Sequence, residues 1–281
     1  MPGTLYVVAT PIGNLEDVTL RALRILRDVS LIAAEDTRRT ARLLQHYSIS
    51  TRTTSLHEHN ERARTPALIA HLQAGESIAL VSDAGTPALS DPGAHLVAAA
   101  HAGGIRVEPV PGASAALAVL SASGFDDKEF LFVGFPPSRS KARKKWLLRL
   151  SKEERPLVMY EAPHRIWVTL GDAAEILGDR LVALGREVTK LHEELVVRPI
   201  SGHIAAATEG RGEYTLVIKG ASANVDPATA PAPLCLQREF GELTELRGLG
   251  RRQAIRELAE QHGLSARTVF DVLEQAKKSG S

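Results

Sequence analysis

Cysteine is almost absent from this sequence, because Cys235 is the single cysteine among 281 residues. A lone cysteine excludes disulfides within the chain and zinc sites built from cysteines, and it is typical of a reducing compartment. The sequence also contains no run of 18 uninterrupted apolar residues and no basic, apolar leader at its start. We therefore expect neither a secretory signal nor contact with a membrane, and we expect a cytoplasmic protein.

Aromatic residues are scarce, at 4% of the sequence, and neither sign of charge is in excess, with 34 Lys and Arg against 33 Asp and Glu. A core poor in aromatic residues and rich in Ala, Leu and Val favours an α/β architecture. The length and the 44% share of hydrophobic residues are enough for two globular cores. Any surface that binds a polyanion has to come from local clustering of basic residues.

Short apolar runs alternate with helical patterns in the first part of the chain. Strands are expected at residues 5–9, 31–34, 78–81 and 106–110, with helices between them. This alternation predicts a mostly parallel sheet covered by helices, in a first α/β domain over residues 1–124.

The pattern changes from residue 130 onward. We expect strands at 130–134 and 157–161 and helices at 140–152 and 166–177, followed by three closely spaced strands at 181–187, 192–198 and 214–219. Such an order predicts a mixed sheet in a second α/β domain over residues 125–220.

A small, proline-rich segment without periodicity predicts a linker over residues 221–233. The tail beyond it, residues 234–281, contains two short amphipathic patterns joined at His262 and Gly263, with Ser265 as a possible N-cap. This resembles a helix-turn-helix, and we expect a small recognition or dimer-contact module.

Three glycine- and proline-containing turns follow predicted strands. VATPIGN (8–14) lacks the glycine spacing of dinucleotide-binding turns, and the chain lacks a P-loop motif. VSDAGTPALSDPG (81–93) places amides, hydroxyls and two carboxylates at the carboxyl end of a strand, where open α/β sheets bind ligands. In VPGASAALAVLSASG (110–124), the helix start at Ser114 offers free amides to a ligand carboxylate, or Ser114 simply caps the helix.

These turns occur in order with AEDTRRT (34–40), SLHEHN (55–60), FVGFPP (132–137), YEAPHRI (160–166), GREVTKLHEE (185–194) and GEYTLVI (212–218). Together they resemble the tetrapyrrole-methylase superfamily over residues 5–219. They are most similar to a branch that methylates the ribose 2′-hydroxyl of a cytidine in the decoding region of small-subunit (16S) ribosomal RNA.

The resemblance implies two α/β domains with S-adenosyl-L-methionine in the cleft between them, usually in a homodimer, and small-subunit rRNA, in the assembled subunit, as the partner. It also implies a set of residues near the cofactor, carried over motif by motif: Ile12, Asp83, Ala84, Thr86, Ser114, Ala115, Tyr160, Glu161, Glu213 and Tyr214.

Methylation of a hydroxyl requires alignment of oxygen, carbon and sulfur, and it is helped by a group that removes the proton. The candidate catalytic residues are Glu35, Asp36 and His164, with His59 as a further candidate. Asp36 is equally explained as a helix cap paired with Arg38 or Arg39. A metal is not expected, because His57 and His59 have no third ligand at a typical spacing.

The densest basic segment, residues 138–152, has seven Lys or Arg residues, no acid, and Trp146 in its middle. It predicts a surface that follows RNA phosphates, although a solvated helix face that turns Trp146 inward explains it as well. The residues expected to bind RNA are Arg38, His59, Lys141, Arg143, Lys144, Lys145 and Arg165.

Two other functions fit parts of the sequence. A porphyrinoid C-methyltransferase would use the same scaffold, and a ligand-sensing regulator would bind nucleic acid through the helix-turn-helix-like tail. The AEDTR, HEHN and YEAPHR segments favour RNA methylation, and the similar numbers of acids and bases in the tail disfavour duplex DNA binding.

Overall fold

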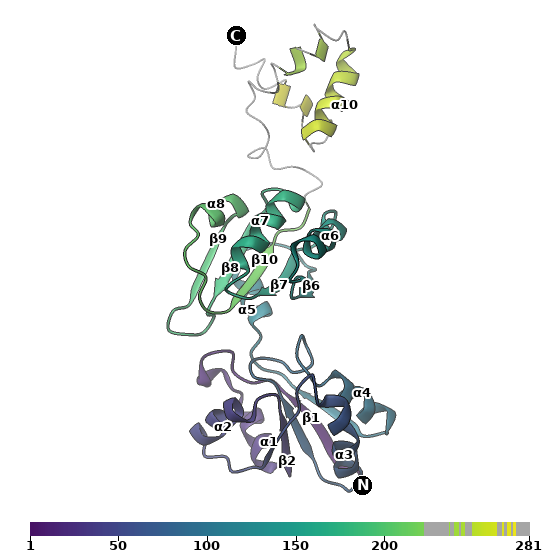
Figure 1. The fold of residues 1–281 in the computed structure, drawn as a ribbon, viewed down its shortest axis with the longest axis vertical. Coiled ribbons are helices and arrows are strands. Elements are labelled where there is room, and N and C mark those ends of the chain that lie inside the picture. Colours follow the sequence, from purple (N-terminus) through teal and green to yellow (C-terminus); the bar gives the residue numbers. More distant parts are fainter. Residues whose placement is uncertain are drawn as a thin grey trace. The chain divides into compact units, whose positions relative to one another are not determined.

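The computed structural model describes residues 1–221, 236, 239–241, 243–244, 249–262, 266, 269–270 and 272–273. The chain forms two compact units, Met1–Leu148 with Pro156–Lys219, and Arg149–Arg155 with Gly220–Ser281. The first unit contains two five-stranded sheets (Figure 1). Residues 222–233 of the predicted linker lie outside the described residues, as do Gly263 and Ser265 of the tail.

The first sheet is parallel throughout and has the strand order β3-β2-β4-β1-β5. Its strands are β1 (Thr4–Val8), β2 (Leu31–Ala34), β3 (Thr53–Ser55), β4 (Ile78–Val81) and β5 (Arg106–Val110). Its helices are α1 (Leu20–Asp28), α2 (Thr37–His46), α3 (Glu61–Gln73) and α4 (Ala94–Ala102), with a 3-10 turn η1 (Leu15–Asp17) before α1.

Helices cover both faces of this sheet. One apolar cluster joins Ala79 and Val81 to α1 and α2, and another joins Ile78 and Leu80 to α3 and α4. Alternate residues of β4 thus point to opposite faces, and all four are buried because both faces are covered. The carboxyl ends of parallel strands meet at one edge, so the predicted motif turns after β1, β2, β4 and β5 come together there.

The second sheet is mixed, as the closely spaced strands predicted. Its order is β6-β7-β10-β8-β9, with β6 and β7 parallel and the other pairs antiparallel. Its strands are β6 (Leu131–Gly134), β7 (Leu157–Glu161), β8 (Leu181–Arg186), β9 (Glu194–Pro199) and β10 (Tyr214–Ile218), and its helices are α6 (Ser140–Leu150), α7 (Ile166–Leu177) and α8 (Ile200–Ala205). The predicted α/β fold class is confirmed.

Helix α5 (Ala115–Ala122) departs from the sequence prediction. It follows β5 of the first sheet and was expected within a first domain, yet its buried residues Ala116 and Val119 pack against Val158, Ala183 and Val217 of the second sheet. A helix of small apolar residues can pack closely against either sheet, so its sequence does not indicate which sheet it contacts. Its first turn thereby comes to lie at the candidate site.

The tail has an apolar core of its own. Helix α10 (Arg251–His262) contributes Ala254, Ile255, Leu258 and Ala259 to a cluster with Leu236, Leu243, Val269, Val272 and Leu273. The first predicted amphipathic helix therefore closes its apolar face within the tail, while much of the second lies outside the described part of the chain. None of the described helices is long and apolar enough to cross a membrane.

Candidate active site

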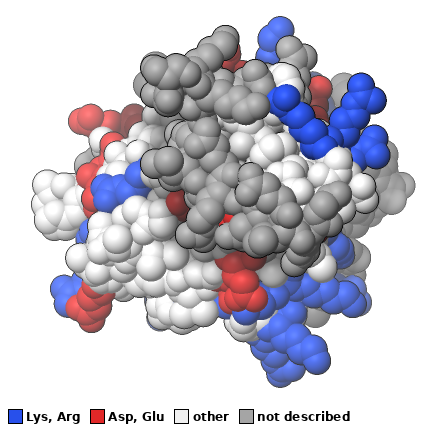
Figure 2. All heavy atoms as spheres, turned by 90° about the horizontal axis from the view of Figure 1, so that it is seen from above, with Lys and Arg blue, Asp and Glu red and all other residues white. Residues whose placement is uncertain are grey.

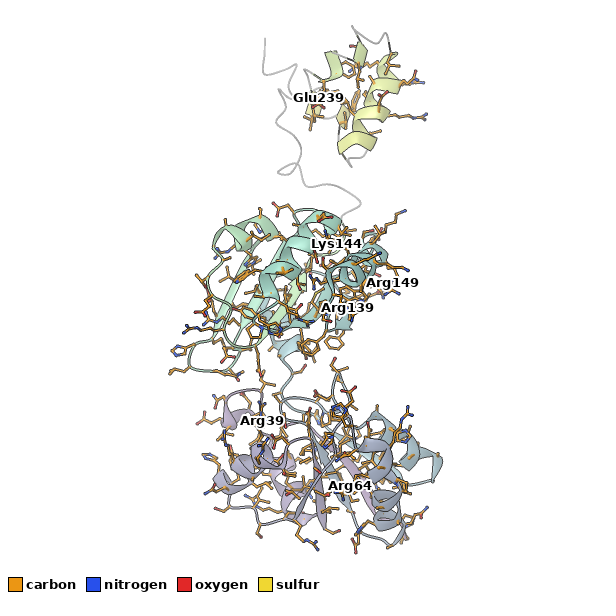
Figure 3. The ribbon with its side chains drawn as sticks, viewed as in Figure 1. Arg39, Arg64, Arg139, Lys144, Arg149 and Glu239 are labelled. Carbon is orange, nitrogen blue, oxygen red and sulfur yellow. The ribbon has the colours of Figure 1, made fainter. Side chains whose placement is uncertain are left out.

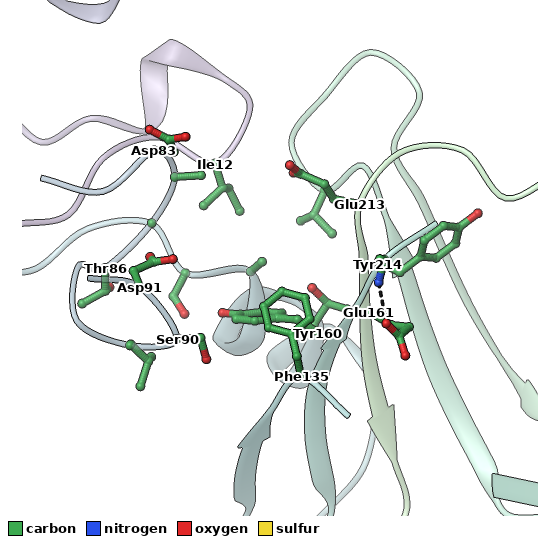
Figure 4. A pocket seen from close by; sticks show the side chains of 18 of the residues that line it. Ile12, Asp83, Thr86, Ser90, Asp91, Phe135, Tyr160, Glu161, Glu213 and Tyr214 are labelled. Atoms are coloured by element: carbon green, nitrogen blue, oxygen red, sulfur yellow. Dashed lines mark hydrogen bonds between the residues drawn. The ribbon is translucent and has the colours of Figure 1, made fainter. Parts of the chain in front are cut away.

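A pocket of about 360 Å³ is lined by residues from both sheets of the first unit (Figure 4). This volume lies within the range of about 300–1,000 Å³ that is usual for small-ligand sites. The structure brings to it every residue that the family resemblance assigned to the cofactor: Ile12, Asp83, Ala84, Thr86, Ser114, Ala115, Tyr160, Glu161, Glu213 and Tyr214. Their individual roles stay predictions.

Two of the motif turns that contribute residues to this pocket are hydrogen-bonded to each other. The Thr10 amide donates to the Gly85 carbonyl at 2.8 Å, and the Gly85 amide donates to the Thr10 carbonyl at 3.0 Å. The Thr10 hydroxyl also donates to the carbonyl of Ser82 at 3.1 Å. Gly85 has a φ of 80°, a conformation that glycine adopts without strain. Ile12 and Asp83 are fixed in place by this pairing.

The turn after β1 also contacts the loop after β8. A side chain at Gly13 would collide with Lys190 and Thr189, and the Asn14 amide donates to the Thr189 hydroxyl at 3.0 Å. Lys190 Nζ lies 2.9 Å from carboxylate oxygens of both Glu187 and Glu213. These two ion pairs hold Glu213 at the pocket.

Three carboxylates of the first sheet line the pocket: Glu35, Asp83 and Asp91. The Asp83 amide donates to Glu35 Oε2 at 3.1 Å, while Asp83 Oδ1 accepts from the Asp36 amide at 3.0 Å and Oδ2 lies 3.5 Å from Arg39. Burial and the charges of Glu35 and Asp83 raise the pKa of Asp91 to about 6, against a hydrogen bond from Ser82 that lowers it. The pocket thus favours a positively charged ligand.

Asp36 points its carboxylate at the start of α2 and is absent from the described residues that line the pocket. It accepts from the Arg38 amide at 2.8 Å and from two nitrogens of the Arg38 side chain. These hydrogen bonds lower the pKa of Asp36 to about 2. The capping alternative accounts for Asp36, and Arg38 is held beside it.

Of the three predicted catalytic residues, only Glu35 lines the pocket. His164 is exposed and outside the described lining residues, and His59 lies on an exposed turn with its ring 6.0 Å from that of His57. Within the described residues, no group of three or more His, Cys, Asp or Glu side chains is placed to hold a metal ion.

The second sheet supplies an aromatic wall. The rings of Phe135 and Tyr160 have centroids 5.5 Å apart, and Figure 4 shows them side by side at the pocket. Burial raises the pKa of Tyr160, whereas hydrogen bonds from the Ala116 amide and the Ser114 side chain act to lower it. Ser114 makes no side-chain capping hydrogen bond to α5. The simple N-cap alternative for Ser114 is therefore not what the structure shows.

Glu161 lines the pocket, but its carboxylate is fully buried and already paired. It accepts from the Ala162 amide at 2.7 Å and the Thr169 hydroxyl at 2.6 Å, and it lies 2.5 Å from Arg165. Arg165 was expected to contact RNA. The structure gives it an interior partner instead, because its guanidinium neutralises the buried Glu161 carboxylate, and its contact with RNA stays a prediction.

Helix α6 divides its basic residues between the interior and the surface. The Arg143 side chain is 2% exposed, lies 2.6 Å from Asp172, and donates to the carbonyls of Pro137 and Ser138. Its predicted contact with RNA is wrong, because it is an interior residue. Lys144 pairs with Glu175, while Lys141 and Lys145 are exposed.

Several pocket residues were missed by sequence reasoning, namely Arg39, Leu89, Phe135 and Val188, while Ser90 and Asp91 were noted only among the hydroxyls and carboxylates of their loop. All of them fall inside the quoted motifs. The motifs located the loops, but which side chains of a loop face the ligand depends on turn geometry. Ala88 and Ser90, for example, have φ values of 64° and 67°, which no pattern in the sequence signals.

Residues 4–202 match the family of tetrapyrrole (corrin/porphyrin) methylases. The chain belongs to this family. Proteins named ribosomal RNA small subunit methyltransferase I resemble this tetrapyrrole methylase along most of its length. The protein from Synechocystis sp. is 45% identical over 281 residues, covering 99% of this chain and 100% of its own length. The protein from Escherichia coli O157:H7 is 42% identical over 275 residues, with shares of 93% and 96%.

Among solved structures, a uroporphyrin-III C-methyl transferase from Thermus thermophilus, complexed with S-adenyl homocysteine, is 17% identical to this chain with a TM-score of 0.57. The likeness covers 77% of this chain and 97% of that one, and it shows the shared fold. The resemblance inferred from the motifs is confirmed, and the expected S-adenosylmethionine-dependent methylase is confirmed at the level of the family.

Proposed function

We propose that this chain transfers a methyl group from S-adenosyl-L-methionine to the 2′-hydroxyl of a cytidine ribose in the decoding region of small-subunit rRNA. One observation carries the proposal: motif residues from distant parts of the chain meet in a single pocket of suitable size. The names of the relatives support rRNA as the substrate, since a full-length relative at 45% identity is called an rRNA small subunit methyltransferase.

The pocket residues fit the cofactor. Glu35, Asp83 and Asp91 give negative charge suited to a sulfonium, and Phe135 and Tyr160 give apolar area suited to an adenosine. The small side chain of Ala115, at the first turn of α5, leaves room for a ligand carboxylate near the start of that helix.

The bound cofactor supplies an electrophilic methyl group. The chain's contribution is mainly positioning, which can account for several kcal/mol of barrier, roughly 7–11 in the best cases. The paired turns at Thr10 and Gly85 hold the first sheet's side of the pocket in one geometry, and the rings of Phe135 and Tyr160 line the other side. Tyr214, buried at the start of β10, belongs to the second sheet's side.

RNA contacts are proposed for exposed basic residues outside the pocket. Lys141 and Lys145 lie on α6, and Figure 3 shows Arg139 and Arg149 projecting from the same segment. Basic and acidic side chains are interspersed on the described part of the face in Figure 2, so local clusters of this kind are needed to follow phosphates. The target ribose, with its 2′-hydroxyl, is read in the pocket.

The proposal extends to the organisation of the protein. We retain α/β domains at 1–124 and 125–220, a linker at 221–233 and a tail at 234–281, in a cytoplasmic homodimer that acts on the assembled small subunit. The separate apolar cluster of the tail supports a module that folds by itself. Helix α5 is an exception, because it precedes the boundary at residue 124 and packs on the second sheet.

The test is methyl transfer with a labelled methyl group on S-adenosylmethionine. Purified protein is incubated with isolated small subunits, with free rRNA, or with a porphyrinoid, and labelled RNA is mapped for ribose methylation. We expect one 2′-O-methylated cytidine in the decoding region, with more label on the subunit than on free rRNA. Label on the porphyrinoid alone would establish the C-methyltransferase alternative, and label on a base would refute ribose methylation.

A further inference from the structure

Asp91 has a position that no family motif assigned to a role. It lies in the loop between β4 and α4 and lines the pocket, and Figure 4 shows its carboxylate beside Thr86, on the side of the pocket that faces Tyr160. The buried hydroxyl of Ser82 lies near it and also faces the carbonyls of Ala84 and Gly85 at 3.5 Å. A carboxylate accepts about four hydrogen bonds, so acceptor capacity remains free toward the pocket.

The loop that carries Asp91 is held firmly. The Ala88 amide donates to the Pro92 carbonyl at 3.3 Å, and Ala88 and Ser90 keep positive φ angles that cost energy in residues other than glycine. Glu61 of α3 accepts from the amides of Gly93, His95 and Leu96 at 2.9–3.2 Å, which fixes the start of α4. A side chain on such a support can be held in one orientation.

The charged groups around Asp91 are mostly acidic. Glu35 comes from the end of β2, Asp83 from the end of β4, and Tyr160 from β7; Glu61 of α3 is occupied by the amides of α4. The nearest cation in the pocket lining, Arg39 of α2, lies against Asp83. Burial and this repulsion raise the pKa of Asp91 to about 6, which is close to the operating range of a general base.

The other carboxylates are less suited to take a proton. Asp36 is bonded to the Arg38 amide and side chain at the start of α2, and Asp83 accepts from the Asp36 amide and faces Arg39. Glu35 accepts from the Asp83 amide. Asp91 is the pocket carboxylate with neither a cation nor a backbone amide as a partner in the described residues.

We propose that Asp91 is the general base of methyl transfer, a role that rests on the proposed function. The ribose 2′-oxygen forms a bond to the methyl carbon, and the carbon–sulfur bond breaks with its electron pair remaining on sulfur, which becomes a neutral thioether. The proton of the 2′-hydroxyl passes to the Asp91 carboxylate and from there to solvent after the product leaves.

The experiment compares Asp91→Asn with Asp36→Asn, and uses Asp28→Asn, an exposed partner of Arg24 on α1, as the control. Single-turnover methyl transfer to isolated small subunits is measured from pH 5 to 8. We expect Asp91→Asn to be slower by about a hundredfold or more, the usual contribution of a positioned base. The wild-type rate should fall below about pH 6, following the pKa of Asp91, and this acid limb should be absent from the residual rate of the variant.

Calorimetry supplies a second readout that does not depend on turnover. We expect Asp91→Asn to bind S-adenosylmethionine and S-adenosylhomocysteine with affinities within about threefold of wild type, so that the loss lies in the chemical step. Asp91→Glu should restore part of the rate and the acid limb. The variant could instead lose the preference of the site for the cationic S-adenosylmethionine over the neutral S-adenosylhomocysteine. If that loss of affinity were large enough to explain the slower rate, Asp91 would bind the cofactor through its charge and would not be the general base.

The remaining outcomes separate the two proposals. If wild type methylates ribose and Asp91→Asn does so at a similar rate with the same acid limb, the role of Asp91 is refuted and the proposed function stands. If Asp36→Asn removes the acid limb instead, the base is Asp36. If wild type transfers no methyl group to ribose in isolated subunits or free rRNA, the proposed function fails, and the role of Asp91 in it fails too.

Discussion

Acidic residues serve different purposes on the two sheets. On the first sheet, Glu35, Asp83 and Asp91 lie close together at the pocket, and only Asp83 has a cation near it. On the second, Glu161 is paired with Arg165, and Asp172 with Arg143, in the interior. The same residue types thus form interior ion pairs beside the second sheet and leave unneutralised charge at the ligand site beside the first.

The unpaired carboxylates at the pocket should lower the stability of the folded protein, whereas the paired interior carboxylates should not. Neighbouring like charges destabilise the folded state, and such sites are typical of function rather than architecture. A paired interior carboxylate is different, because removing it leaves a buried cation without a partner. Substitutions of acids on the two sheets should therefore change stability in opposite directions.

The largest effect is expected from Asp172→Ala. Arg143 would be left buried without its carboxylate, which costs about 3–5 kcal/mol of the free energy of unfolding. Urea denaturation measures this loss, with Glu175→Ala as the matched control, because that exposed partner of Lys144 should cost under about 1 kcal/mol. The double variant Arg143→Met, Asp172→Leu should recover much of the stability, and equal losses in Asp172→Ala and Glu175→Ala would contradict the account.

The next effect concerns ligand affinity. Asp83→Ala removes one of the three pocket carboxylates and the acceptor of the Asp36 amide, so its affinity for S-adenosylmethionine should fall about tenfold or more, at roughly 1.4 kcal/mol per tenfold. The control is Asp179→Ala, which removes an acid that accepts from Ser201 at the start of α8. It should lower stability by about 1 kcal/mol and leave affinity unchanged. Equal affinities in calorimetry of the two variants would remove Asp83 from the site.

A smaller effect of opposite sign is expected for Asp91→Asn. The pKa of Asp91 is raised from 3.8 to about 6, so the folded protein binds this proton more tightly than the unfolded chain. The free energy of unfolding of wild type therefore falls as pH rises between about 4 and 6. Since Asp91 is partly exposed, the variant should be more stable than wild type at pH 7.5 by only about 1 kcal/mol, with no gain at pH 4. Urea denaturation at both pH values would contradict this if the variant were less stable at pH 7.5.

The smallest effect is expected from the surface of α6. Lys141→Gln with Lys145→Gln removes two exposed cations, so RNA binding should weaken a few-fold and its logarithmic salt slope should fall by about 1.4–1.8. Filter binding at several salt concentrations measures the slope. Lys128→Gln, an exposed lysine before β6, is the control for a single surface charge. An unchanged slope in the double variant would show that the exposed face of α6 does not contact RNA phosphates.

The strands were predictable because their patterns are local. Residues 31–34, 78–81 and 106–110 are strands as the sequence indicated, and the close spacing of three strands after residue 180 indicated the mixed sheet. The sheet partner of α5 was not predictable, because a helix of alanine and valine fits either sheet. The motifs located the pocket loops because turns, like strands, depend on local sequence and have characteristic residues.

Whether an individual charged residue would be buried, cap a helix or face the pocket was not predictable. Arg143 lies in a run of Lys and Arg that predicts an exposed helix face, and only the tertiary partner Asp172, 29 residues away, explains its burial. Asp36 and Asp91 both follow strands in motif turns, yet one caps a helix and the other faces the pocket. Sequence patterns fix neither choice, because both depend on contacts between distant segments.

The most direct test is calorimetric titration of Ser114→Trp with S-adenosylmethionine. Ser114 lines the pocket, so an indole there should fill much of the space and lower the affinity by at least about a hundredfold, or 2.7 kcal/mol. Leu117→Trp is the matched control, because Leu117 lies one turn further along α5 and is 54% exposed. We expect one site per chain in wild type and Leu117→Trp and no measurable binding in Ser114→Trp; undiminished binding in Ser114→Trp would show that the cofactor binds elsewhere.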